Sequence, residues 1–375
     1  MKDAAKVLDP VELIGCELRG LYSAHGYTRY RMSKFEEYDL YSRHKEFLVS
    51  DGVLTFTDTD GRLRALKPDV TLSIIKNTRD REDPLAVDKL FYCENVYRIS
   101  RQSGGFREIQ QIGLECIGGV DSLCVCETVF LAARSLEAIG RPYVLELSHT
   151  RLLEAVADRI ASGAEADDRE ELRLKIIGAV KTKNRSLAGE IAAGSLLGDA
   201  GKELLFELTS SGTDLCRLAG FFEEDDEASG YIRELSAVTG YLKARGMGGS
   251  AAVDLSVDGG ADYYNGTVFR GYVEGISDRV LSGGRYDLLM ERMGRKGSAV
   301  GFAVYLDEIA RLFDAGSKTD ADTVILYRDG DDVLQVLELS ERLSRDGSVY
   351  VCRSVPDGFR YRKLVRFPGK TEQTE

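Results

Sequence analysis

Two periodicities of apolar side chains run along the first part of the chain. Between residues 10 and 26 apolar positions recur at helical spacing, which predicts an amphipathic helix. Residues 53–66 alternate apolar and polar side chains around an Asp-Gly pair, a pattern that predicts a β-hairpin. Residues 89–100 and 107–119 predict two longer strands joined by a polar loop that contains glycine.

Helical patterns alternate with these strands. Residues 67–80 predict a helix with Asp69 and Thr71 at its start. Residues 122–140 predict another helix, which is followed by a predicted strand over 143–149. This order of elements predicts an α+β unit with a mainly antiparallel sheet in the first part of the chain.

The pattern changes twice further along the chain. The middle is rich in charged residues and alanine and predicts helices, and strand patterns return after residue 250. Residues 299–313 predict a closing helix, and 323–353 predict a β-α-β unit after a polar linker. We therefore expect a discontinuous domain over 1–150 and 248–313, a helical insertion over 151–247, and a small C-terminal β-α-β unit over 321–375.

Polar residues interrupt the predicted strand 107–119. Side chains alternate across a strand, so Gln111, Gly113 and Glu115 share one face. The glycine between two polar groups predicts room for a ligand against the sheet. A buried carboxylate is costly, so Glu115 needs a cationic or hydrogen-bond-donor partner. Arg98 or Arg107 could pair with it, or with a phosphate or carboxylate of a ligand. The strand alone is equally compatible with an internal ion-pair network that only holds the sheet.

Tyrosines and glycines recur later in the chain. Tyr263 and Tyr264 are predicted on opposite faces of a strand, and a glycine turn leads into Arg285, Tyr286 and Asp287. Each tyrosine alone also fits core packing. Together with the polar residues above, they predict a concave site for a small cationic group such as an ammonium or an imidazole.

Composition and charge narrow the class of protein. The 375 residues have a formal net charge of −12, which argues against a general nucleic-acid binder, although a local basic groove is compatible with it. Seven scattered cysteines fit reduced thiols in a cytosol. No apolar run reaches the ~20 residues of a membrane span, and no histidine or cysteine spacing indicates a metal site. We expect a cytoplasmic protein without metal or cofactor.

Four segments, in order, resemble histidyl-tRNA synthetases and their paralogues. They are LKPDVT, VYRIS…GGFREIQQIGLECIG, DYYNGTVF and GGRYDLLMERMG…AVGFAVYLDEI. The resemblance implies the class II aminoacyl-tRNA synthetase catalytic domain, an antiparallel sheet flanked by helices and usually dimeric. It also implies that Arg98 is the arginine that holds the ATP phosphate and the substrate carboxylate. The implied histidine pocket consists of Asp69, Thr71, Arg98, Gln111, Glu115, Tyr263 and Tyr264.

Departures from the synthetase pattern fall on cationic positions. Gly259 stands where the synthetases have an arginine that stabilises adenylate formation, and Glu308 replaces the arginine that grips ATP. Ser100 replaces a glutamate that follows Arg98 in the family. Preorganised cations normally stabilise the negative charge of such a transition state, so we expect aminoacylation activity to be lost. The C-terminal unit also looks short for the family's anticodon-binding domain.

Among the paralogues, the chain is similar to the regulatory subunits of ATP phosphoribosyltransferase. That similarity implies a non-catalytic protein that assembles with a short-form catalytic subunit in histidine biosynthesis and is required for its activity. It further implies histidine as an allosteric effector, a homodimer within a hetero-oligomer, and no tRNA or membrane partner. A divergent histidyl-tRNA synthetase and another amino-acid-binding paralogue remain as alternatives.

Overall fold

The computed structural model describes residues 8–48, 52–99, 104–162, 166–194, 199–210, 212–223, 226–257, 263–313, 319–368 and 370–373. The chain divides into a larger compact unit, Pro10–Leu312, and a smaller C-terminal one that begins at Phe313. None of the described helices has both the length and the apolar character that crossing a bilayer requires.

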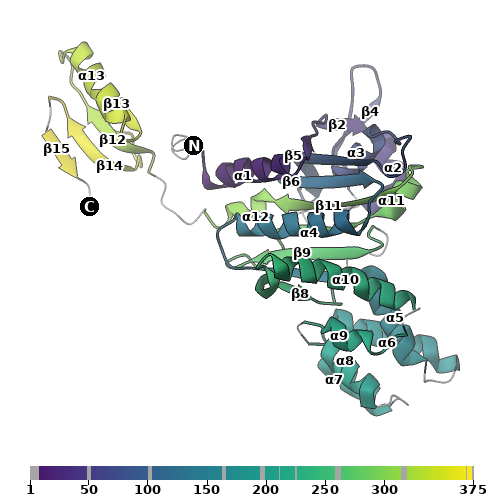
Figure 1. Ribbon diagram of the computed structural model, residues 1–375. Coiled ribbons are helices and arrows are strands. Elements are labelled where there is room, and N and C mark those ends of the chain that lie inside the picture. The colour runs from purple at the N-terminus through teal and green to yellow at the C-terminus, as the bar shows by residue number, and fades with distance from the viewer. Residues whose placement is uncertain are drawn as a thin grey trace. The chain divides into compact units, whose positions relative to one another are not determined.

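An eight-stranded sheet is the centre of the larger unit, with the order β1-β5-β6-β11-β10-β9-β7-β8 (Figure 1). All neighbouring strands between β5 and β7 in this order are antiparallel. The two edge pairs, β1 with β5 and β7 with β8, are parallel. Strands β9, β10 and β11, from the last part of the unit, therefore lie between β6 and β7, which come from its first part. Their bounds are β1 (Thr28–Arg29), β5 (Val87–Ile99), β6 (Phe106–Gly118), β7 (Tyr143–His149), β8 (Ala251–Val253), β9 (Thr267–Val273), β10 (Leu281–Arg285) and β11 (Ser298–Tyr305).

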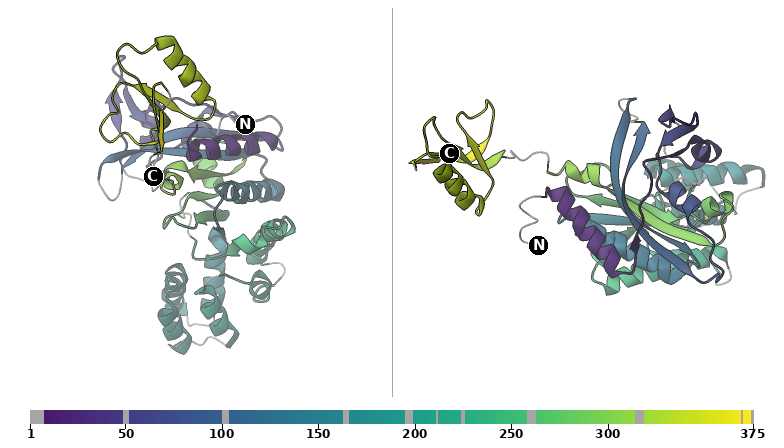
Figure 2. Two further views of the ribbon diagram at one scale, coloured as in Figure 1. Left: turned by 90° about the vertical axis from the view of Figure 1, so that its left-hand side faces the viewer. Right: turned by 90° about the horizontal axis from the view of Figure 1, so that it is seen from above.

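Helices α1 (Pro10–Ala24) and α4 (Ser122–Glu137) lie along one face of this sheet (Figures 1 and 2). The predicted helix over 10–26 is thus confirmed. Buried Tyr22 of α1 packs edge-on against Phe91 of β5 and Phe302 of β11, with ring centroids 6.1 and 5.9 Å apart. These rings fix α1 on the sheet by apolar burial.

The opposite face is covered by three short helices, α2 (Tyr38–Arg43), α3 (Thr71–Asn77) and α11 (Asp287–Arg292). Tyr92 and Val96 of β5 point into this second core because neighbouring residues alternate across the strand. Leu72, Ile74 and Ile75 of α3 are fully buried there. This packing places the first turn of α3 against β6.

The predicted helix over 299–313 is wrong. The chain forms β11 up to Tyr305, and only Leu306–Ala310 form a short helix, α12. Strand β11 is nearly covered on both faces, so its apolar run shows no alternation, and such a run cannot be told from a buried helix. At Gly301 an added Cβ would lie 1.8 Å from Glu115 Oε2, so the strand passes too close to β6 for a larger residue.

The middle of the chain is helical and belongs to the larger unit. Helix α10 packs against α4 and α5, which connects this segment to the helical layer on the sheet. The predicted helices at 151–162, 167–183 and 230–245 correspond to α5, α6 and α10 and are confirmed. The helices are α5 (Thr150–Ala161), α6 (Ala166–Lys181), α7 (Arg185–Gly194), α8 (Asp199–Leu208), α9 (Leu215–Ala219) and α10 (Glu227–Ala244).

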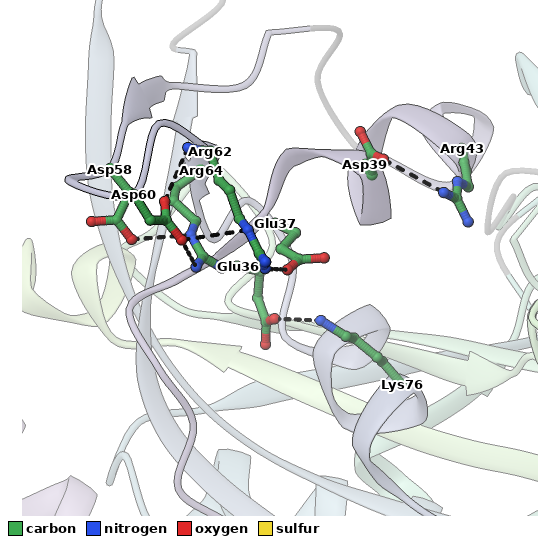
Figure 3. A network of polar contacts seen from close by, with 9 residues as sticks. All are labelled: Glu36, Glu37, Asp39, Arg43, Asp58, Asp60, Arg62, Arg64 and Lys76. Atoms are coloured by element: carbon green, nitrogen blue, oxygen red, sulfur yellow. Dashed lines mark hydrogen bonds and ion pairs between the residues drawn. The ribbon is translucent and has the colours of Figure 1, made fainter.

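A three-stranded sheet, with the order β2-β4-β3, contains β2 (Phe35–Glu37), β3 (Thr55–Thr57) and β4 (Leu63–Leu66). The predicted hairpin over 53–66 is confirmed, and Gly61 in its turn has a φ of 79°. Charged side chains cover this sheet, and Figure 3 also shows two separate ion pairs, Glu36–Lys76 reaching α3 and Asp39–Arg43 within α2. Arg64 lies within ion-pair distance of Glu37, Asp58 and Asp60.

The C-terminal unit is a small β-α-β fold with a four-stranded sheet in the order β13-β12-β14-β15. Strands β12 and β13 are parallel and are joined by α13, which confirms the predicted elements over 323–353. Two further strands complete the sheet. The elements are β12 (Ala321–Leu326), α13 (Val333–Ser344), β13 (Val349–Cys352), β14 (Tyr361–Arg366) and β15 (Lys370–Gln373).

A buried ion pair fixes the connection between β4 and α3. Lys67 is fully buried, and its Nζ lies 2.8 Å from Glu94 Oε2 on β5. We expect Glu94→Gln to lower the free energy of unfolding by about 3–5 kcal/mol, because it leaves a buried ammonium without its counter-charge. Denaturant unfolding measures this change.

The matched control is the exposed pair Arg43–Asp39, which is drawn in Figure 3. Asp39→Asn is expected to cost less than about 1 kcal/mol. The double variant Lys67→Met/Glu94→Gln should recover most of the loss. Equal costs for Glu94→Gln and Asp39→Asn would contradict the importance of the buried pair.

Candidate functional site

A cavity of about 360 Å³ lies against the sheet at β6, β10 and β11. Its walls come from the start of α3, the turn before β9 and the start of α11. The structure brings together the seven residues of the implied histidine pocket. Lining this one cavity are Asp69, Thr71, Arg98, Gln111, Glu115, Tyr263 and Tyr264. Arg285 and Asp287, also predicted near a site, instead pair with each other at another cavity.

Glu115 is buried on β6, and its carboxyl group accepts hydrogen bonds from two hydroxyl groups. Thr71 Oγ1 lies 2.9 Å from Oε1, and the Tyr286 hydroxyl donates to Oε2. Burial raises the pKa of Glu115 to about 8, and the nearby Asp69 carboxylate raises it further, against the hydrogen bonds. The expected need of Glu115 for a cationic or donor partner is thus met by two hydroxyl donors, whereas Arg98 pairs with Asp69 instead.

Asp69 is the second buried carboxylate of the cavity and the one that has an arginine. Arg98 Nη2 lies 3.6 Å from Asp69 Oδ2, and Arg98 Nε donates to the Pro68 carbonyl at 2.8 Å. The backbone N–H of Leu72 donates to Asp69 Oδ1 at 3.0 Å. Burial still raises the pKa of Asp69, against the opposing effect of Arg98. Arg98, predicted as a partner of Glu115 or of a ligand, is thus positioned by Pro68 and Asp69.

Gln111 and Gly113 continue the line of Glu115 along β6. Gln111 is 2% exposed and its amide makes no side-chain hydrogen bond among the described residues, so it can bind a ligand. The predicted ligand space at Gly113 is wrong. An added Cβ there would lie 2.6 Å from the Tyr92 hydroxyl and 2.1 Å from the Phe302 carbonyl oxygen, so the missing side chain makes room for Tyr92.

Tyr263 and Tyr264 do not lie on a strand, which corrects the prediction of opposite faces. Both precede β9 and line the cavity, with ring centroids 4.7 Å apart and planes inclined by 67°. Tyr263 also packs against Tyr286 at 5.9 Å. Burial raises the pKa of each of these phenols above its usual value, so all three stay neutral and form an aromatic wall.

Sequence reasoning underestimated three hydroxyl groups of the cavity. Tyr286 was visible only as part of a glycine turn, and its role depends on a contact with Glu115 that spans 171 positions. Ser282 and Tyr305 share a hydrogen bond of 2.5 Å on the cavity floor. Tyr305 was hidden because its segment was predicted to be helical. Recognising β11 as a strand would have placed Tyr305 opposite Gln111, its partner in the register with β6.

A smaller cavity of about 140 Å³ shares Arg98, Arg279 and Tyr305 with the larger one. Its other charged residues are Arg107, Asp278, Asp307 and Glu308. Glu308 Oε2 lies 2.5 Å from Arg311 Nη1 on the same helical turn. Gly259 and Ser100, the other departures from the synthetase pattern, lie outside the described residues.

The family model for histidyl-tRNA synthetase matches residues 9–309. The chain belongs to the histidyl-tRNA synthetase family. The fold just described is accordingly the class II synthetase catalytic domain, as predicted. It shares this fold with a Bacillus halodurans structure described as an ATP phosphoribosyltransferase regulatory subunit/histidyl-tRNA synthetase, with a TM-score of 0.72, 20% identity, and 95% and 93% of the two chains covered.

Curated relatives within this family bear two different names. The ATP phosphoribosyltransferase regulatory subunit of Clostridium kluyveri is 28% identical, with 88% of this chain and 86% of the relative covered. The protein of the same name from Geobacter sulfurreducens is 29% identical, with 90% and 78% covered. The histidine–tRNA ligase of Methanocaldococcus jannaschii is 26% identical, with 89% and 79% covered. The predicted similarity to the regulatory subunits is confirmed.

The raised pKa of Glu115 predicts a pH-dependent effect of Glu115→Gln. Between pH 4.5 and about 8 the unfolded chain loses this proton while the folded protein keeps it, so wild-type stability falls as pH rises. The variant lacks this loss. We expect its free energy of unfolding, relative to wild type, to increase through this window and then level off. Denaturant titrations at about pH 5 and pH 8.5 measure the difference.

Glu108→Gln on the same strand is the matched control. Hydrogen bonds from Asn95 and Tyr97 lower the pKa of Glu108, so its contribution is present at neutral pH and lost in acid. This loss falls below about pH 4.5, outside the window from pH 5 to 8.5, so the stability of Glu108→Gln relative to wild type should stay nearly constant there, unlike that of Glu115→Gln. An effect of Glu115→Gln that is identical at both pH values would contradict the raised pKa.

Proposed function

We propose that this chain is a regulatory subunit of ATP phosphoribosyltransferase. It would assemble with a short-form catalytic subunit that condenses ATP with phosphoribosyl pyrophosphate, and would be required for that activity. The names of the curated relatives from C. kluyveri and G. sulfurreducens support this assignment. The observation that carries it is the contrast between the two cavities, one equipped for an amino acid and the other without the positive charge that ATP requires.

The larger cavity supports histidine as the small-molecule effector. Asp69, Thr71 and Gln111 offer a carboxylate, a hydroxyl and an amide to an α-ammonium group. Glu115 and the wall of tyrosines offer a hydrogen-bonding acid and flat apolar surface to an imidazole. Histidine would change the activity of the complex through a difference in affinity between two arrangements of the subunits.

The smaller cavity supports the loss of aminoacylation. Arg98, Arg107 and Arg279 face Asp278, Asp307 and Glu308. The charges of this cavity balance, whereas adenylate formation needs an excess of preorganised cations. Losing one such donor typically costs roughly 10²–10³-fold in rate. The chain would therefore act without catalysis of its own, as a homodimer within a hetero-oligomer and without tRNA.

The decisive experiment is reconstitution with a short-form catalytic subunit. We expect the two proteins to co-purify, the condensation of ATP with phosphoribosyl pyrophosphate to depend on this chain, and histidine to inhibit it. Absence of a stable complex and of any stimulation would overturn the proposed function. Stimulation without histidine inhibition would remove only the effector role.

Gln111→Leu tests the cavity directly. We expect it to weaken histidine binding about 10- to 100-fold in calorimetry, because it removes a hydrogen-bonding amide and leaves the ligand's polar group unpaired. Gln110→Leu is the matched control, since Gln110 is the exposed neighbour on the other face of β6. Equal affinities of the two variants would place histidine outside this cavity.

A second candidate function is that of a divergent histidyl-tRNA synthetase, which the relationship to the M. jannaschii ligase favours. Histidine-dependent exchange of pyrophosphate into ATP by the isolated chain would support it. If the ligand is a different amino acid, a thermal-shift screen would identify it, because a specific ligand stabilises the folded state by mass action.

A further inference from the structure

The larger cavity contains an arginine that no described carboxylate neutralises. Arg279 lies in the loop between β9 and β10, is partly buried, and lines both the larger and the smaller cavity. Among the described residues no carboxylate oxygen lies within 4.0 Å of its guanidinium, the limit for an ion pair. The adjacent Asp278 instead accepts a hydrogen bond from the backbone N–H of Arg279 at 2.9 Å.

Among the other arginines at these cavities, Arg98 has an ion-pair partner, and Arg270 and Arg107 each lie where their charge acts on a carboxyl group. Arg98 is held by Asp69 and the Pro68 carbonyl. Arg270 on β9 lies opposite Glu146 of β7 in the strand register, and its charge acts on that carboxyl. Arg107 reaches only the smaller cavity, where its charge acts on Asp307. Arg279 therefore differs from Arg98 in having no ion pair among the described residues, and from Arg270 in lining both cavities, so its charge is available to a ligand at their junction.

The position of Arg279 fits one particular part of an amino acid. The α-ammonium and α-carboxylate of an amino acid share one carbon atom, so they bind side by side. With the ammonium at Asp69, the carboxylate lies near Arg98, where the larger cavity meets the smaller one. Arg279 lines both cavities at this junction and its charge also acts on the Tyr264 hydroxyl. A buried carboxylate needs such a partner, and a planar guanidinium matches it in geometry.

We propose that Arg279 binds the α-carboxylate of the ligand and so makes the cavity select amino acids over the corresponding amines. This inference rests on the proposed function, because it concerns the same cavity and takes histidine as the ligand. It adds a specificity-determining residue outside the segments that carry the family resemblance.

The test compares L-histidine with histamine, which has the same imidazole and amine but no carboxylate. Calorimetry on the purified chain should show that wild type binds histidine more tightly than histamine. Arg279→Gln should weaken histidine binding about 10- to 100-fold and change histamine binding by less than about 3-fold. Arg279→Lys should restore part of the histidine affinity, because it keeps the charge but loses the planar geometry.

Arg134→Gln serves as the matched control, since Arg134 lies on α4 on the opposite face of the sheet and is 43% exposed. It should leave both affinities as in wild type. A parallel loss of histidine and histamine binding in Arg279→Gln would indicate a structural role and overturn the inference, as would an unchanged histidine affinity. If wild type binds neither ligand, both this inference and the effector role fail, whereas the reconstitution experiment still tests the regulatory function.

Discussion

The burial of two carboxyl groups in one cavity is the constraint around which the larger unit is arranged. One arginine is available to Asp69, and Glu115 relies on hydroxyl groups that come from two other elements. Thr71 must therefore stand at the start of α3 and Tyr286 at the start of α11, both against β6. Strand β11 must be glycine at residue 301, because the Glu115 carboxyl occupies the place of a side chain. Satisfying a single buried acid thus fixes two helices and a neighbouring strand.

Much of this arrangement was predictable, for reasons that lie in local periodicity. The alternation along β6 places Gln111 and Glu115 on one face, and an Asp-Gly pair is sufficient to predict the hairpin of β3 and β4. The wrong predictions concern positions where contacts between distant parts of the chain determine the structure. Strand β11 lacks alternation because both of its faces are covered, and the space at Gly113 is filled by Tyr92 from the neighbouring strand. The hydroxyl partners of Glu115 lie 44 and 171 positions away in the sequence. Local periodicity cannot predict contacts at such separations.

The relation between the two cavities explains how a synthetase fold can serve regulation. Recognition of an amino acid uses hydroxyls, an amide, carboxyl groups and arginines, and residues of all these kinds lie together in the larger cavity. Activation of an amino acid needs an excess of positive charge around a nucleotide, whereas the smaller cavity has three arginines and three acidic residues. Because the walls of the larger cavity come from α3, α11 and the turn before β9, a ligand would contact all of these elements at once. Binding would then favour the one arrangement in which they are correctly placed.

The strand order of the sheet also governs when the protein can fold during synthesis. Strand β6 pairs with β11 along its whole inner half, from Gln111 opposite Tyr305 to Gly118 opposite Ser298. One edge of β6 consequently stays open until the ribosome has made β7, the helical segment, β8, β9, β10 and β11 itself. At elongation rates of about 5–20 residues per second, that edge is exposed for roughly ten seconds or more. An unpaired edge of this kind is a template for wrong strand pairing, so the nascent chain is open to misfolding during that interval.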